Sequence, residues 1–79
     1  MEIRFSKSAL RSLLRSNKAA LIRSKIAELA SDPESQAPNV KRLQGREECR
    51  LRVQDWRVIF RISEDVLFID AIGPRGSIY

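Results

Sequence analysis

Residues 49–72, CRLRVQDWRVIFRISEDVLFIDAI, decide the fold because apolar side chains recur there at every second position. A period of two is the repeat of a β-strand, in which successive side chains point to opposite faces. Two polar pairs interrupt the alternation, and short polar breaks between strands are typical of hairpin turns. The pattern therefore predicts an antiparallel meander of three strands. The predicted strands are residues 49–53, 56–62 and 66–72, joined by turns at 54–55 and 64–65.

A turn at residues 54–55 would also set the register of the first two strands. The facing pairs on one side would all be apolar, so that side is predicted to be the core face. On the other side Arg52 would face Arg57. Like charges directly opposite in a sheet destabilise it by a few tenths to about 1 kcal/mol. Because such exceptions to folding rules often mark functional sites, the arginine pair predicts an anion-binding site.

A solvated basic face is the alternative interpretation of this arginine pair. Carboxylates at Glu47, Glu48 or Asp70 could neutralise part of the charge as ordinary surface pairs, which contribute little to stability. The anion-binding interpretation is favoured because the two arginines face each other at the hairpin end.

The first part of the chain carries helical patterns after one short strand. Residues 2–5, EIRF, alternate polar and apolar side chains, and Ser6 follows as a candidate helix N-cap. Leucines at helical spacing predict a helix over residues 7–15, and an apolar stripe predicts a second over residues 18–30. Pro33 ends this helix because the residue before a proline avoids helical geometry.

The remaining segment, residues 31–48, is predicted to be a surface connection anchored by Val40 and Leu43. The predicted fold is α+β, with an N-terminal strand and helical hairpin packed on an antiparallel β-meander. We expect a single domain over residues 1–79.

The composition of the chain narrows its partners and excludes some chemistry. It has 79 residues and a formal net charge of +5, which favours polyanionic partners, nucleic acid first and an acidic protein second. A solubilising excess of charge is the alternative. With one cysteine and no histidine, zinc has no plausible ligand set. No signal-peptide pattern or membrane-length apolar run is visible, so we expect a cytoplasmic protein and no membrane contact.

The final segment, IGPRGSIY at residues 72–79, adds an arginine and a tyrosine. A turn at Gly73 and Pro74 would bring Arg75 and Tyr79 beside the facing arginines. A phenol near pH 7 is ionised only about one part in a thousand, but nearby positive charge favours the phenolate. Tyr79 could then act as a general base; the alternative is a frayed terminal residue.

Residues 39–79 resemble the C-terminal half of RelE-type toxins, of the RelE/ParE superfamily of bacterial toxin–antitoxin systems. Those proteins commonly show an L-x-G turn, then R-L-R-V-G-D-Y-R-V-I-Y, a hydrophobic strand, and G-H-R-x-x-I-Y. RLRVQDWRVIFRI followed by IGPRGSIY is specific as a pair. The strand, helical hairpin and LA-x-DP of the N-terminal half are similar too, so the resemblance covers essentially the whole chain.

The resemblance implies a RelE-like microbial RNase fold and a ribosome-dependent mRNA endonuclease that needs no metal or cofactor. Arg57 would hold the scissile phosphate, Arg75 would stabilise the developing charge, and Tyr79 would be the general base. Arg50 stands where some members carry a lysine, and its high pKa suits an electrostatic role better than proton donation. Pro74 replaces the histidine that usually precedes the motif arginine. Candidate RNA-binding residues are Lys41, Arg42, Arg50, Arg52 and Arg61.

The resemblance also implies partners and leaves rival functions open. Members are inhibited by a cognate antitoxin protein in a hetero-oligomer, and they act on the ribosome and mRNA. ParE-type toxins look similar but poison DNA gyrase without nuclease activity, and they generally lack the arginine and terminal-tyrosine set. A non-catalytic RNA- or antitoxin-binding module is a further alternative.

Overall fold

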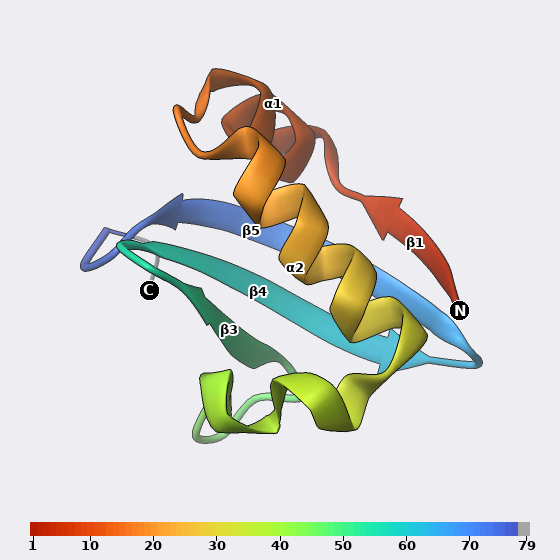
Figure 1. Cartoon of the computed structure of the whole chain (residues 1–79). Coiled ribbons are helices and arrows are strands. Elements are labelled where there is room, and N and C mark those ends of the chain that lie inside the picture. The colour runs from red at the N-terminus through yellow and green to blue at the C-terminus, as the bar shows by residue number, and fades with distance from the viewer. Residues whose placement is uncertain (78–79) are drawn as a thin grey trace.

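The computed structural model describes residues 1–77, so the candidate base Tyr79 lies outside the described residues. Helices and strands follow one another as the resemblance implied, with one addition between the helices and the meander (Figure 1). In chain order the elements are β1 (Glu2–Phe5), α1 (Lys7–Arg15), α2 (Ala19–Ser31), the 3-10 helix η1 (Pro33–Asn39), β2 (Val40–Arg42), β3 (Cys49–Val53), β4 (Trp56–Ser63) and β5 (Val66–Pro74).

The strands form one sheet in the order β1-β5-β4-β3-β2. Strands β2 to β5 pair antiparallel, and β1 pairs in parallel with β5. The predicted α+β fold is confirmed, including the meander over residues 49–72. The nearly all-apolar β5 lies inside the sheet, where Leu67 and Ile69 are fully buried.

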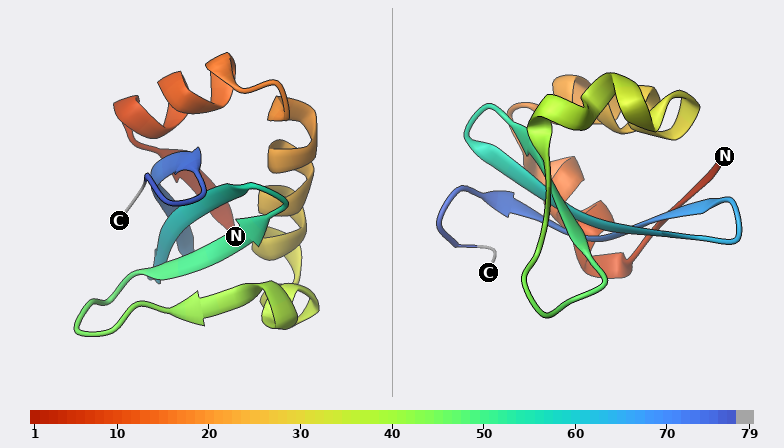
Figure 2. Two further views of the ribbon diagram at one scale, coloured as in Figure 1. Left: turned by 90° about the vertical axis from the view of Figure 1, so that its left-hand side faces the viewer. Right: turned by 90° about the horizontal axis from the view of Figure 1, so that it is seen from below.

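Buried side chains of both helices and of one face of the sheet form a single hydrophobic core. In Figure 1, α2 crosses in front of β4 and β5, and Figure 2 shows α1 running across the direction of α2. Ile22, Ile26 and Leu29 of α2 recur at helical spacing and are buried against the sheet. Each fully buried aliphatic side chain of this size contributes about 1.5–3 kcal/mol.

Ser6 links the start of α1 to the sheet. Its Oγ accepts the backbone N–H of Ala9 at 3.0 Å, which confirms the predicted N-cap. The same hydroxyl donates to the carbonyl of Asp70 at 2.8 Å. Asp70 is the extra residue of a β-bulge, because Ile59 pairs with Ala71 and Phe60 pairs with Ile69. A bulge leaves such a residue out of the regular ladder, and Ser6 supplies a hydrogen bond to its carbonyl.

The prediction that residues 31–48 form only a surface connection is wrong. The segment contains η1, begun by Pro33 at a first-turn position that suits proline. It also contains β2, which adds a fourth antiparallel strand through the pairing of Val40 with Leu51. A strand of three residues is too short to show alternation. Its exposed Lys41 and Arg42 charge the edge of the sheet, which discourages pairing with other chains.

The two hairpin turns lie where the sequence predicted them, between β3 and β4 and between β4 and β5. Gln54, Glu64 and Asp65 have φ values of +53°, +51° and +65°. These left-handed conformations favour glycine or asparagine, so each turn keeps some backbone strain. No helix within residues 1–77 is long and apolar enough to cross a membrane.

Candidate functional site

The β3–β4 hairpin adopts the predicted register. Arg52 pairs directly with Arg57, and Arg50 pairs with Ile59. The apolar partners on the core side include Leu51 and Val58, both fully buried. The two arginines therefore meet at the hairpin end of the sheet. Their pair is next to that of Val53 and Trp56, which closes the turn.

Arg75 is brought to the same end of the sheet by a backbone contact. Its N–H donates to the carbonyl of Asp55, in the β3–β4 turn, at 2.7 Å. Figure 1 shows this turn and the segment after β5 side by side at one end of the sheet. The contact holds Arg75 beside Arg52 and Arg57, although it lies 18 residues from Arg57 in the sequence.

Arg52, Arg57 and Arg75 line one pocket that is open to solvent and has a volume of about 470 Å³. Small-molecule sites commonly measure about 300–1,000 Å³, so this pocket has room for more than a single phosphate group. The structure thus brings together three of the predicted site residues. The remaining lining residues are Leu21, Lys25, Asn39, Val53, Gln54 and Asp55.

Arg57 forms the buried part of this arginine cluster, with only 8% of its surface exposed. Its Nη1 donates to the carbonyl oxygens of Gln54 at 2.7 Å and Trp56 at 2.9 Å. A buried charge is costly unless it is hydrogen-bonded or paired, and these two bonds offset only part of that cost. Both of these bonds use Nη1, so within residues 1–77 the Nε and Nη2 groups keep their donors for a ligand.

None of the three arginines forms an ion pair with another residue in the described part of the chain. Arg52 and Arg75 are exposed, and Asp55 lines the pocket without pairing with either. Guanidinium groups have a planar fork of donors that matches phosphate oxygens in pairs. The arrangement is chemically suited to bind a phosphate and to stabilise additional negative charge on it.

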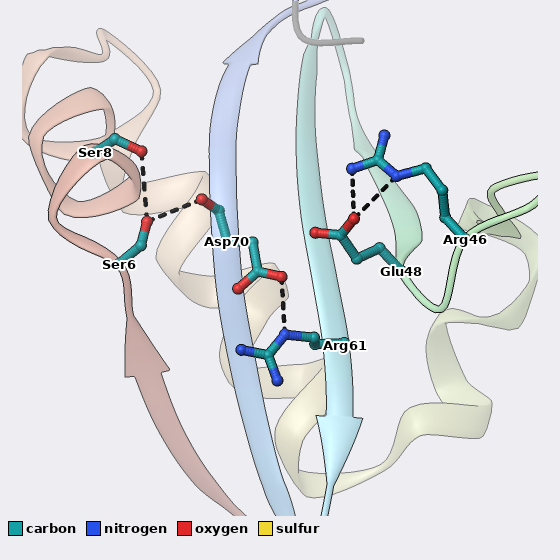
Figure 3. A network of polar contacts seen from close by, with 6 residues as sticks. All are labelled: Ser6, Ser8, Arg46, Glu48, Arg61 and Asp70. Carbon is teal, nitrogen blue, oxygen red and sulfur yellow. Dashed lines mark hydrogen bonds and ion pairs between the residues drawn. The ribbon is translucent and has the colours of Figure 1, made fainter.

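Arg61, predicted to bind RNA, is already paired. Its Nε donates to Asp70 Oδ2 at 3.0 Å, and its guanidinium lies 4.2 Å from the centre of the Phe68 ring (Figure 3). These contacts hold it in the bulged part of the sheet, away from the pocket-lining set.

Three more of the predicted RNA-binding residues also lie outside the pocket lining: Lys41, Arg42 and Arg50. Lys41 and Arg42 are exposed on the edge strand β2, and Lys41 pairs with Arg50 of β3. Arg50 is half-buried on the same strand as Arg52. Lys41, Arg50 and Arg52 therefore lie on one face of the sheet between the β2 edge and the pocket, whereas Arg42, which pairs with Cys49, lies on the other face.

Two acidic residues lie farther along the same sheet, outside the pocket lining. Glu48 pairs with Arg46, and Asp70 pairs with Arg61 (Figure 3). Partial burial, and then the adjacent Glu48 carboxylate, raises the pKa of Asp70 above its ordinary value. Hydrogen bonds from the Asp70 carboxyl and from Arg46 lower the pKa of Glu48. Neutralisation by acidic neighbours thus applies to Arg46 and Arg61, and leaves the arginine pocket unpaired.

Lys25 and Asn39 line the pocket but were not among the predicted site residues. The sequence shows that Lys25 lies off the apolar stripe of α2. It does not show the pairing of β2 with β3, which places Asn39 at the pocket. Within residues 1–77, no three His, Cys, Asp or Glu side chains are grouped as metal ligands.

This fold is that of the RelE-like toxins. An archaeal RelE from a RelE–RelB complex of Pyrococcus horikoshii superposes with a TM-score of 0.79 at 23% identity, covering 96% of each chain. Isolated Escherichia coli RelE gives 0.74 at 18% identity, over 94% of this chain and 83% of that one. E. coli YafQ gives 0.75 at 14% identity, over 96% of this chain and 94% of that one.

The chain belongs to the ParE toxin family of type II toxin–antitoxin systems (parDE), whose model matches residues 3–79, and thereby to the RelE/ParE superfamily. No curated protein sequence matches it. The superfamily membership expected from the two motifs is confirmed, and the protein is the toxin of a type II system.

Proposed function

We propose that this toxin is a metal-independent endoribonuclease that cuts mRNA in the ribosomal A site. The observation that carries the proposal is the pocket in which Arg52, Arg57 and Arg75 meet without a carboxylate partner among residues 1–77. Three unpaired guanidinium groups cost stability, and a phosphodiester would repay that cost on binding. The structural likeness to RelE and YafQ shows the fold, and by analogy it supports RNA cleavage as the activity.

In the proposed reaction the ribose 2′-oxygen attacks the adjacent phosphorus. The bond from phosphorus to the 5′-oxygen breaks, which leaves a 2′,3′-cyclic phosphate, and the departing 5′-oxygen takes a proton from water to become a free 5′-hydroxyl. Arg57 holds the phosphate from the pocket floor, and Arg75 stabilises the charge that develops on its oxygens. Removing one such donor typically costs about 10²–10³ in rate. No cofactor takes part.

Proton transfer is assigned to Tyr79, which would take the proton of the 2′-hydroxyl as a phenolate. A general base of suitable pKa contributes about 10²–10⁴ in rate. Arg50 and Arg52 would support the phosphate electrostatically. Lys41 and Arg42, exposed on β2, would contact RNA phosphates outside the pocket, and Arg61 would contribute less because Asp70 already holds it.

The natural partner that we propose is a cognate antitoxin, bound in a hetero-oligomer. RelE chains of E. coli and P. horikoshii were crystallised in complexes with RelB. On this chain, Leu10 and Leu14 lie one helical turn apart on α1 and are 41% and 64% exposed. A partner with apolar anchors and acidic flanks would cover this stripe and neutralise the basic surface.

Gyrase poisoning is the second candidate function, and the family match to ParE favours it. A gyrase poison needs no phosphate-binding arginine cluster. The two candidates therefore differ in what the loss of Arg75 does.

Brief induced expression in bacteria, with mRNA 5′ ends mapped by primer extension, distinguishes the two. The nuclease proposal expects cuts in phase with codons of translated messages, absent for Arg75→Ala and retained for Arg23→Ala, an exposed arginine outside the pocket. Growth arrest without cuts, accompanied by DNA breaks, would instead indicate the gyrase function.

A further inference from the structure

The arginine pocket is lined from two layers of the molecule. The sheet and its loops supply the three arginines, while α2 supplies Leu21 and Lys25 and the end of η1 supplies Asn39. At about 470 Å³ the pocket exceeds the needs of one phosphate, and its lining includes apolar side chains, Leu21 and Val53, as well as charged and polar ones. A nucleotide needs both kinds of surface, because its phosphate is charged and its base is flat and largely apolar.

Asn39 is placed beside the arginines by the register of β2. Val40 pairs antiparallel with Leu51, so Asn39, one residue earlier, comes alongside Arg52, one residue later. Asn39 is half-buried, and no hydrogen bond of its side chain to another described residue is recorded. An amide carries both donors and acceptors, which is what reading the edge of an unpaired base requires.

Lys25 of α2 adds a positive charge to the lining of the pocket. Its Nζ lies 3.2 Å from Glu28 Oε2, in a pair whose side chains are 36% and 47% exposed. Exposed pairs of this kind contribute little to stability, so the ammonium can exchange the carboxylate for a phosphate.

We propose that Lys25 and Asn39 form a nucleotide subsite next to the scissile phosphate. Lys25 binds a neighbouring phosphate, Asn39 hydrogen-bonds the base edge, and Leu21 and Val53 contact the base face. This inference rests on the proposed nuclease function. It identifies Asn39 and Lys25 as residues that would set which base the nuclease prefers next to the cleaved bond.

The test measures binding of a fluorescent, 2′-O-methylated RNA hexanucleotide to the purified toxin by anisotropy, over a series of salt concentrations. The 2′-O-methyl groups block cleavage, so only binding is observed. For single strands, the slope of log K against log salt changes by about 0.7 for each phosphate contact. Lys25→Ala should therefore flatten the slope by about 0.7, and alanine is well tolerated inside a helix.

Asn39→Ala is expected to weaken binding without changing the salt slope, and to reduce the difference in affinity among hexanucleotides of different sequence. Glu28→Gln should tighten binding, because it releases Lys25 from its partner. Lys18→Ala removes the same charge from an exposed position outside the pocket and should leave the slope unchanged.

The result separates this inference from the proposed function. If Arg57→Ala abolishes binding while the Lys25 and Asn39 variants keep the wild-type slope and sequence preference, the subsite is wrong and the nuclease proposal stands. If the wild-type protein binds no hexanucleotide, the subsite is overturned, while the nuclease proposal is decided by cleavage of mRNA on ribosomes. Circular dichroism of each variant excludes a loss of fold.

Discussion

The backbone N–H of Arg75 lies 2.7 Å from the carbonyl oxygen of Asp55, so the segment after β5 is tied to the β3–β4 turn. This single hydrogen bond places a third guanidinium group beside the directly paired Arg52 and Arg57. The pocket is thus assembled by backbone pairing, with the repulsion among its arginines left uncompensated in the described chain. The arginine cluster should therefore lower the free energy of unfolding while it provides a site for an anion.

Replacing Arg52 tests directly whether the arginine pair lowers stability. Arg52→Thr removes the like-charge pair and introduces a residue that suits strands, so the free energy of unfolding should rise by a few tenths to about 1 kcal/mol. Urea denaturation monitored by circular dichroism measures the change. The matched stability control is Arg42→Thr, whose residue pairs with Cys49 and should give no comparable gain. Equal gains for both variants would contradict a specific repulsion.

Arg57 should be dispensable for folding and required for activity. Arg57→Met keeps much of the volume and removes a charge that is largely buried, so we expect stability to be unchanged or increased. Cleavage should fall by at least about 100-fold, as for the loss of a donor to developing charge. Parallel measurements of unfolding and of mRNA cleavage check this prediction. A variant that unfolds would instead make Arg57 a structural residue.

The β4–β5 turn should be improvable without affecting function. Glu64 and Asp65 both have positive φ, a conformation that Asn-Gly adopts at lower cost. The double substitution Glu64→Asn with Asp65→Gly should stabilise the protein by about 1 kcal/mol, which raises Tm by about 4–8 °C. Differential scanning calorimetry measures Tm, and toxicity should be unchanged because the turn lies outside the pocket.

Ser6 should be the most sensitive serine of the described chain, since one hydroxyl serves both α1 and the bulge. Ser6→Ala loses the N-cap and leaves the Asp70 carbonyl without that donor, so we expect a loss of about 1–2 kcal/mol. Thermal unfolding followed by circular dichroism measures it. Ser24→Ala, on the exposed face of α2, should stay within about 0.5 kcal/mol of the wild type.

The raised pKa of Asp70 predicts a pH dependence of defined sign. A carboxyl whose pKa is higher in the folded state binds more protons there than in the unfolded chain. Its contribution to stability therefore decreases as pH rises from the ordinary value of 3.8 through the raised folded value. Glu48, whose pKa is lowered from 4.5, contributes with the opposite sign as pH rises toward 4.5.

Glu48→Gln separates the two causes of the Asp70 shift. Removing the adjacent carboxylate should move the pKa of Asp70 down toward its ordinary value, while the part due to burial stays. An NMR titration of the Asp70 carboxyl carbon in both proteins measures the difference. An unchanged pKa of Asp70 would show that burial alone accounts for the shift.

The sequence predicted the parts of the fold that depend on local repeats. Alternation over residues 49–72 and two short polar breaks were sufficient for the meander, its turns and the facing of Arg52 and Arg57. Strand β2 was missed because three residues cannot show a period. Once β2 is known, its register predicts that Asn39 lies beside Arg52.

Contacts that depend on tertiary detail were not predictable. Arg61 was among the residues predicted to bind RNA, and nothing in the sequence indicated which carboxylate it would meet. The bulge at Asp70 shifts the register of β5 there and places a carboxylate within 3.0 Å of Arg61. Lys25 reaches the pocket only because α2 packs across β3, which no local pattern in the sequence encodes.

The most direct test of the central claim uses bacterial ribosomes programmed with a short mRNA and a defined A-site codon. Purified wild-type toxin and Arg23→Ala should cut that codon and leave a 2′,3′-cyclic phosphate. Arg57→Ala and Arg75→Ala should cut at least about 100-fold more slowly. An intact mRNA with the wild-type toxin, together with accumulation of cleaved DNA by purified gyrase, would show that the toxin poisons gyrase and is not a nuclease.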